Sequence, residues 1–196
     1  MHLDRQGKAG DATLLLQQLQ QILGTGGVLT DMHDRTFYST DLSWRPGEIA
    51  SAVIQPDSVE KLADAVRVTT TAGFSIVPRG GGMSYTSGYT PAEQTSVLVD
   101  MRRMDRILEI NQDDLYVVVE CGCTWKALHE TLGPLGLRTP YWGPLSGAYA
   151  TVGGALSQNS LFHGSGTEGT VAQSVIGLKV VLSDGSVVTT GSGAHK

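Results

Sequence analysis

The chain has 196 residues, 25 of them glycine, with 40% apolar residues and a formal net charge of −5. The acidic balance argues against non-specific nucleic-acid binding, which depends on clustered cations, and no apolar run approaches the roughly 20 residues of a membrane span. The N-terminus lacks the apolar core of a secretory signal, and two cysteines make no disulfide framework. We therefore expect a soluble, cytoplasmic protein of one domain or two small lobes.

Residues 1–45 predict a helix followed by an irregular arm. Between Asp11 and Leu23 the leucines and the isoleucine keep one apolar face, and Gly24 can end the helix. Residues 30–47 show no such period. The expected anchors of this arm are Phe37, Tyr38 and Trp44.

Residues 46–101 predict a first, small βαβ lobe of the domain that we assign to residues 46–196. A helical stripe with Asp57 or Ser58 as its cap lies between the first two strand candidates. These candidates are Ile49–Ile54, Ser75–Val77 and, further on, Val97–Val99.

Residues 102–196 predict a second, larger lobe of mostly antiparallel strands with helices. Thr124 can cap a short helix that ends before Gly133. The dipeptide Asp184-Gly185 favours a two-residue hairpin turn. The strand candidates are Ile107–Ile110, Leu115–Val119, Val175–Leu182 and Ser186–Thr189. The predicted fold class is α+β.

The glycines fall mainly in two zones, five between Gly73 and Gly88 and thirteen between Gly133 and Gly193. They stand beside valine, isoleucine and leucine, unlike the Gly/Ser tracts of flexible linkers. Glycine in ordered chain indicates a positive φ or a close approach by a ligand or another strand. Composition alone leaves both readings open.

The sharpest local signal is the loop Arg79-Gly80-Gly81-Gly82-Met83-Ser84 directly after a predicted strand. Successive glycine N–H groups can turn toward one point and bind an anion such as a pyrophosphate. Ser84 can add a hydroxyl donor, and Arg79 can add a charge or pair with a structural carboxylate. The alternative is a tight loop chosen only for its turn.

A second glycine motif, residues 164–169, formally matches GxGxxG. The dinucleotide fingerprint needs a strand before it and a helix after it, and neither is predicted here. No GxxxxGK[ST] motif occurs, which excludes a P-loop nucleotide triphosphatase.

The segment Thr151-Val152-Gly153-Gly154 can let backbone lie flat against a planar ring, or can mark a close strand crossing. Cys121 and Cys123 share a face of a predicted strand end but lack the further ligands of a zinc site. We expect them to be packing thiols. His163 is expected to be structural or exposed to solvent, and no catalytic base is assigned.

Taken together, these motifs resemble the FAD-binding domain of the vanillyl-alcohol oxidase / p-cresol methylhydroxylase (PCMH-type) flavoprotein family of FAD-linked oxidases. The resemblance runs from about Tyr38 to Gly191 and rests on four motifs in the family's order. These are residues 53–60, 78–84, 151–159 and 175–185. The family's fold implies an extended FAD between two α+β lobes.

Carried over position by position, the resemblance implies one set of cofactor-binding residues. It comprises Pro78, Arg79, Gly80, Gly81, Gly82, Met83, Ser84, Pro144, Leu145, Ser146, Gly147, Thr151, Gly153, Gly154, Ser157, Asn159, Gly164, Ser165, Gly166, Val175 and Ile176. Some members attach FAD covalently through a His in the first loop or a Cys before the Thr-Val-Gly-Gly segment. Neither residue stands at those positions here, so we expect non-covalent FAD.

The resemblance implies a flavin-dependent oxidoreductase that oxidises a small hydroxy acid or alcohol by hydride transfer to FAD. In the family a C-terminal cap domain closes the site, and this chain has no room for one. We expect a fragment, or a subunit that a second chain completes. Two alternatives stay open: an FAD-carrying electron-transfer subunit, and a non-enzymatic nucleotide-binding or interaction module. The electron acceptor is not assigned.

Overall fold

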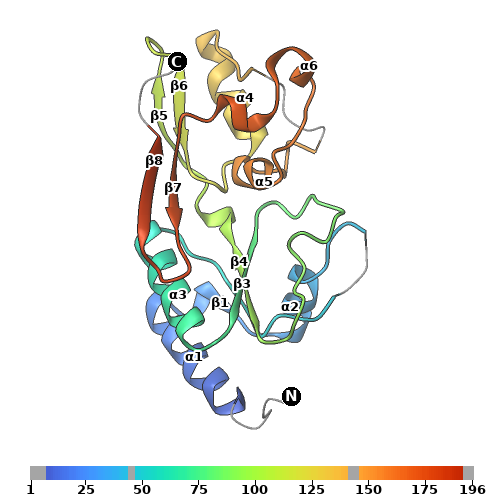
Figure 1. Ribbon diagram of the computed structural model, residues 1–196, viewed down its shortest axis with the longest axis vertical. Coiled ribbons are helices and arrows are strands. Elements are labelled where there is room, and N and C mark those ends of the chain that lie inside the picture. Colours follow the sequence, from blue (N-terminus) through green and yellow to red (C-terminus); the bar gives the residue numbers. More distant parts are fainter. Residues whose placement is uncertain (1–7, 44–46, 141–145, 192–196) are drawn as a thin grey trace. The chain divides into compact units, whose positions relative to one another are not determined.

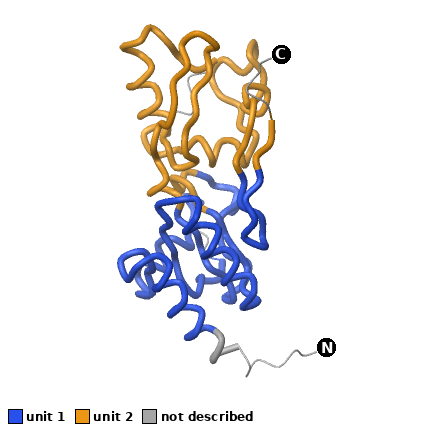
Figure 2. Tube along the Cα trace, turned by 90° about the vertical axis from the view of Figure 1, so that its left-hand side faces the viewer, with its two compact units in different colours: residues 1–78, 84–100, 180–188 blue, residues 79–83, 101–179, 189–196 orange. Residues whose placement is uncertain are grey.

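The computed structural model describes residues 8–43, 47–140 and 146–191, and the chain divides into two compact units (Figure 2). Unit 1 comprises residues 1–78, 84–100 and 180–188, and unit 2 comprises residues 79–83, 101–179 and 189–196. Helices and strands are mixed in both units, which confirms the α+β prediction.

The elements are labelled in Figure 1. The helices are α1 (Lys8–Leu23), α2 (Met32–Tyr38), α3 (Val59–Thr71), α4 (Trp125–Leu132), α5 (Val152–Ser157) and α6 (Ser165–Glu168). The strands are β1 (Val28–Leu29), β2 (Ala52–Ile54), β3 (Ser75–Arg79), β4 (Ser96–Asp100), β5 (Ile107–Asn111), β6 (Tyr116–Val119), β7 (Gly177–Val181) and β8 (Val187–Gly191). None of the helices within the described ranges is long and apolar enough to cross a membrane.

Unit 1 is built on a four-stranded sheet of order β1-β2-β4-β3, in which β2 and β4 are parallel and β1 is antiparallel to β2. The whole of β4 is buried, and this explains its uninterrupted Val97-Leu98-Val99 run. Burying one such side chain stabilises the fold by roughly 1.5–3 kcal/mol. Helices α1 and α3 contact each other (Figure 1).

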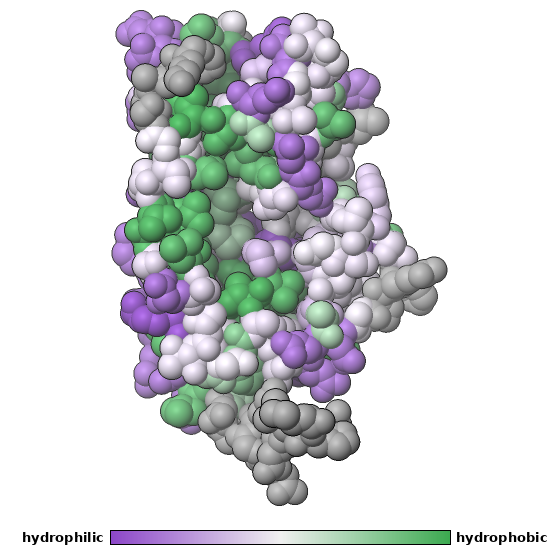
Figure 3. All heavy atoms as spheres, viewed as in Figure 1, coloured by the Kyte–Doolittle hydropathy of each residue, from purple (hydrophilic) through white to green (hydrophobic). Residues whose placement is uncertain are grey.

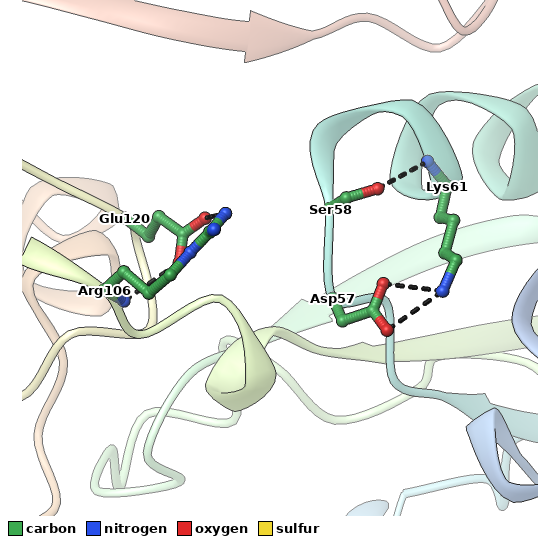
Figure 4. Close-up of polar contacts among 5 residues, drawn as sticks. All are labelled: Asp57, Ser58, Lys61, Arg106 and Glu120. Atoms are coloured by element: carbon green, nitrogen blue, oxygen red, sulfur yellow. Dashed lines mark hydrogen bonds and ion pairs between the residues drawn. The ribbon is translucent and has the colours of Figure 1, made fainter. Parts of the chain in front are cut away.

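The helices of unit 1 begin at polar caps. Ser58, not Asp57, caps α3 by accepting a hydrogen bond of 3.2 Å from the Lys61 N–H (Figure 4). The expectation of an irregular arm after residue 30 is wrong in part, because α2 forms there with Asp31 as its cap. Seven residues are too few to show a helical period in the sequence. Tyr38 is a buried anchor as predicted, whereas Phe37 is exposed and Trp44 lies outside the described residues.

Unit 2 contains the antiparallel β5–β6 hairpin and the helices α4, α5 and α6. Thr124 caps α4 as predicted, accepting a hydrogen bond of 3.1 Å from the Ala127 N–H. The apolar face of α4 enters a core with Cys123 and Ala155. There the rings of Trp125 and Phe162 meet edge to face, with centroids 5.3 Å apart.

Strands β7 and β8 form a hairpin whose loop differs from the prediction. The N–H of Gly185 donates to the Leu182 carbonyl and the N–H of Leu182 donates to the Ser186 carbonyl, so three residues form the loop instead of two. Gly185 takes a φ of +79°, as the third residue of such a loop requires. The loop lies on α3, where the Thr70 hydroxyl donates to the Ser183 carbonyl at 2.7 Å.

The hairpin carries exposed apolar side chains. The exposed fractions of Leu178, Leu182, Val187 and Val188 lie between 36% and 44%. Figure 3 shows hydrophobic surface along this side of the molecule.

Candidate functional site

The structure places the loop of residues 79–83 and the Thr151 segment together in unit 2. A Cβ atom at Gly81 would overlap the backbone carbonyl of Tyr149, and one at Gly80 would overlap the Thr151 hydroxyl. Neither neighbour is the flexible end of a side chain. Glycine at these two positions is therefore required by close packing between the two motifs.

Three N–H groups of this loop are available to a ligand. Those of Gly80, Gly81 and Met83 donate no hydrogen bond to the residues that the structure describes. Gly82, at a φ of +70°, turns the loop, and the guanidinium of Arg79 lies against it. Arg79 is only 6% exposed. A buried cation beside undonated N–H groups fits an anion such as a diphosphate.

Thr151 joins this loop to α5. Its hydroxyl accepts a hydrogen bond of 3.2 Å from the Gly154 N–H and caps the helix, and its side chain is buried. It also forms an isolated β-bridge with Thr124. Residues 152–157 are thus helical, and contact of Gly153 and Gly154 with a planar ring stays a prediction. A helix fits because the Thr151 cap and the loop behind it fix the first turn.

Gly153 serves a close contact with Cys121. Its N–H donates to the Cys121 carbonyl at 2.8 Å, and a Cβ atom at Gly153 would lie 2.6 Å from that of Cys121. Both cysteines are free, and burial raises the pKa of the Cys123 thiol to about 11. They pack as thiols. No cluster of three His, Cys, Asp or Glu side chains able to hold a metal occurs among the described residues.

The residue before Cys121, Glu120, forms an ion pair with Arg106 in which the carboxylate is buried and the Arg106 side chain is exposed (Figure 4). Glu120 is 7% exposed and accepts hydrogen bonds from Arg106 Nη2 at 2.7 Å, Nε at 3.1 Å and the backbone N–H at 2.9 Å. These bonds lower the pKa of the Glu120 carboxyl. The next residue but one, Gly122, donates to the Met104 carbonyl at 2.7 Å. The ion pair therefore lies next in sequence to Cys121, whose carbonyl accepts from Gly153.

Other predicted site residues on this side of unit 2 have structural partners. The Ser157 hydroxyl donates to the Gly153 carbonyl at 2.9 Å, within α5. Asn159, at a φ of +46°, accepts from the Ala172 N–H at 3.2 Å. The carbonyl of Gly147 accepts from Lys126, and that of Ser146 accepts from the N–H groups of residues 149 and 150. These bonds fix the segments and leave Ser157 and Asn159 exposed.

The sequence analysis predicted that the GxGxxG motif is not a dinucleotide fingerprint, and the structure confirms this. Gly164 and Gly169 have φ values of +103° and +78°, and only the four-residue α6 lies between them. Ser165 accepts a hydrogen bond of 2.8 Å from the Phe162 N–H. His163 is exposed.

The remaining predicted residues flank the loop in sequence, precede β7 or lie outside the description. Pro78 and Ser84 belong to unit 1, where Ser84 Oγ lies 2.9 Å from the Thr86 hydroxyl. Val175 and Ile176 precede β7 in unit 2. Pro144 and Leu145 lie outside the described residues.

Two contributors escaped the sequence analysis. Tyr149 contacts the loop through its backbone carbonyl, and no residue type signals such a contact. Thr170 and Gln173 form a capping box, with the Thr170 N–H donating to Gln173 Oε1 at 2.8 Å. The Thr-x-x-Gln spacing was a signal for it.

A family described as FAD binding domain matches residues 50–191 of the chain. Among curated proteins, D-lactate dehydrogenase (cytochrome), mitochondrial, of Arabidopsis thaliana is 33% identical over 184 residues, covering 93% of this chain and 32% of that protein. The D-2-hydroxyglutarate dehydrogenase of Escherichia coli is 33% identical over 181 residues, or 89% of this chain and 17% of that protein. The chain thus spans about a third or less of these relatives' length.

Solved structures agree with the fold. The 4-ethylphenol oxidase of Gulosibacter chungangensis superimposes with a TM-score of 0.81 at 26% identity, covering 93% of this chain and 35% of that one. A p-cresol methylhydroxylase gives a TM-score of 0.78 at 21% identity, covering 93% and 36%. The predicted PCMH-type fold is confirmed by these likenesses.

Proposed function

Because the chain belongs to the family of FAD-binding domains, we propose that it carries the FAD of an oxidoreductase that oxidises a small hydroxy acid or alcohol. The observation that carries this proposal is the glycine loop of unit 2, in which the N–H groups of Gly80, Gly81 and Met83 donate no hydrogen bond to the described residues and follow the buried Arg79. Relatives named for D-lactate and D-2-hydroxyglutarate support the hydroxy-acid class.

In this proposal some residues of the chain bind FAD directly, and others position the residues that bind it. The N–H groups of residues 80–83 bind the FAD diphosphate, and Arg79 offsets its charge. Thr151 keeps the loop and the first turn of α5 in register. The flavin and ribose contacts are assigned to Pro144, Leu145, Ser146, Gly147, Gly153, Gly154, Ser157, Asn159, Gly164, Ser165, Gly166, Val175 and Ile176.

FAD, when bound, supplies the acceptor for a hydride from the substrate. The chain's own part is to bind the cofactor, orient it and exclude water from the diphosphate. The electron acceptor, the base that takes the hydroxyl proton, and any second subunit or cap belong to the whole protein. The chain matches only 32% of the length of the D-lactate dehydrogenase of Arabidopsis thaliana.

The first experiment is reconstitution. The purified chain is titrated with FAD, and quenching of flavin fluorescence gives the dissociation constant, with ADP as competitor and riboflavin as a ligand without diphosphate. We expect FAD to bind, ADP to compete and riboflavin to bind weakly. A folded chain that neither is yellow nor takes up FAD would contradict the proposal.

The oxidoreductase part is tested separately on the flavin-loaded chain. Under anaerobic conditions D-lactate, glycolate and D-2-hydroxyglutarate are added, and bleaching of the oxidised flavin is followed. Bleaching by one of them supports the hydroxy-acid assignment. Binding of FAD without bleaching by any of them, or by simple alcohols, would restrict the chain to cofactor binding.

We also propose that FAD is held without a covalent bond. The loop of residues 79–84 has no histidine, and Tyr149 and Ala150 precede Thr151. The thiol of Cys123 is fully buried, with a pKa raised to about 11, and is therefore a poor nucleophile. After acid precipitation the yellow colour should leave with the supernatant, and colour in the pellet would overturn this point.

A further inference from the structure

Asp41 is a buried carboxylate of unit 1 with no assigned role. It is 5% exposed. Its Oδ1 accepts hydrogen bonds from the Ser43 N–H at 2.8 Å and the Ser43 hydroxyl at 2.5 Å, and its Oδ2 accepts one from the Ser87 N–H at 2.7 Å. The bonds from Ser43 are the main reason that the pKa of Asp41 is lowered. A charged acceptor therefore ties together two segments far apart in the sequence.

The Ser87 end of this tie is conformationally unfavourable by itself. Ser87 has a φ of +58°, in the left-handed region that a non-glycine residue seldom adopts. Its N–H points at Asp41 in this conformation, and a hydrogen bond to a charged acceptor is stronger than one to a neutral acceptor. Asp41 thus offsets the cost of the Ser87 backbone.

The turn between Ser84 and Ser87 has a second link to the same arm. The N–H of Leu42 donates to the Ser84 carbonyl at 3.2 Å. Inside the turn, the N–H of Thr86 donates to Ser84 Oγ at 3.3 Å, and Ser84 is 9% exposed. The segment after the glycine loop is therefore fixed at both of its ends by residues 41–43.

The arm that carries Asp41 is itself anchored at the end of α2. Ser39 is 1% exposed, and its hydroxyl accepts from the Ala50 N–H at 3.1 Å. Arg35 Nε donates to the Ala50 carbonyl at 2.6 Å. Ala50 precedes β2 of the unit 1 sheet. Asp41 is thus held on a rigid base.

Because Ser84 is also the last residue of the proposed diphosphate loop, we propose that Asp41 is a positioning residue for that loop. By fixing Ser84 and Ser87, it limits the conformations open to residues 80–83 and keeps the N–H groups of Gly80, Gly81 and Met83 in place for an FAD diphosphate. This inference rests on the proposed function.

The test uses the 196-residue chain with Asp41→Asn and the milder Ser43→Ala. A carboxamide turns an N–H₂ group toward one of the donors, so Ser43 or Ser87 loses its acceptor. Asp57→Asn is the matched control, because Asp57 is an exposed carboxylate of the same unit, paired at 2.9 Å with Lys61 (Figure 4). Two quantities are measured: amide hydrogen exchange of residues 84–90 without cofactor, and dissociation constants for FAD, ADP and adenosine.

We expect Asp41→Asn to speed exchange at residues 84–90 and to raise the dissociation constants for FAD and ADP by the same factor, about tenfold. Adenosine, which has no diphosphate, should bind as before, and Asp57→Asn should change nothing. Ser43→Ala should act in the same direction by a smaller factor. Adding Ser87→Gly should restore part of the affinity, since glycine adopts a positive φ freely.

The outcomes separate the inference from the proposed function. Faster exchange in Asp41→Asn with FAD and ADP affinities within twofold of the wild-type chain would overturn the inference alone. A wild-type chain that binds neither FAD nor ADP would overturn the proposed function and the inference with it. If Asp41→Asn fails to fold, Ser43→Ala decides by the same two measurements.

Discussion

The two glycine motifs of this chain have similar composition and opposite physical uses. Gly80 and Gly81 leave room for backbone and a buried hydroxyl of residues 149–151. Gly164 and Gly169 instead supply positive φ values, and a Cβ atom at Gly166 would meet nothing within 4 Å. A match to a glycine pattern therefore says little until the neighbours of each glycine are known. The first motif meets residues far away in the sequence, whereas Gly169 of the second meets the side chain of the nearby Gln173.

The largest effect is expected where glycine is sterically obligatory. In Gly81→Ala the added methyl group meets the Tyr149 carbonyl, which is backbone and cannot move aside. We expect the free energy of unfolding to fall by about 3 kcal/mol, the upper part of the range for overpacking. FAD binding should be lost in parallel. Urea unfolding followed by circular dichroism measures the first, and an unchanged midpoint would contradict the close packing.

A smaller effect is expected from the ion pair behind the loop. At neutral pH Glu120→Gln should cost roughly 1.5 kcal/mol, because charge-assisted bonds from Arg106 are weakened. The exposed Arg106 side chain keeps the loss moderate.

The contribution of Glu120 to the free energy of unfolding should depend on pH in a definite direction. The pKa of Glu120 is lowered in the folded chain, so its contribution is present above the unfolded value of roughly 4.3 and is lost as pH falls through the lower folded value. Stability curves of the two proteins measured against pH should therefore converge in acid. A constant difference down to the lowest pH would show that the carboxylate charge is not what matters.

Local signals in the sequence predicted much of this fold. Ser58 and Thr124 stand before helices that they cap, and the apolar run of β4 is buried on both faces. Such features depend on neighbours within a few residues. The short α2 was not predicted, since seven residues carry no measurable period.

The site was predicted as residues but not as geometry. The family resemblance named the loop of residues 78–84 and the Thr151 segment as parts of the site. The contact of Gly81 with Tyr149, however, joins positions far apart in sequence and is made to the backbone of Tyr149. The use of Asp41 depends on the φ of Ser87, which no residue type in that loop announces. Non-local backbone contacts are what sequence patterns leave out.

The contact between the loop of residues 79–83 and the start of α5 is tested by Thr151→Val. This variant keeps the shape of the side chain and removes the hydrogen-bond acceptor that caps the Gly154 N–H. We expect about 1 kcal/mol of destabilisation, typical of a lost helix cap. Thr151→Ser keeps the hydroxyl and should lose less. Thermal unfolding of the three proteins measures the order, and a larger loss in Thr151→Ser than in Thr151→Val would mean that the methyl group, not the cap, is needed.

The smallest effect on stability is expected in the second motif. Gly166 lies inside α6 with no atom near its absent Cβ, so Gly166→Ala should change the free energy of unfolding by less than about 0.5 kcal/mol. The variant Gly166→Ala therefore separates an effect on FAD binding from an effect on stability. With the fold unperturbed, a rise in the FAD dissociation constant would come from contact between the new methyl group and the cofactor, as proposed for residues 164–166. Unchanged affinity would leave the first motif as the cofactor site and remove the second from it. Since Gly81→Ala is expected to lose both stability and binding, the pair of variants shows whether the two uses of glycine are as different in function as they are in structure.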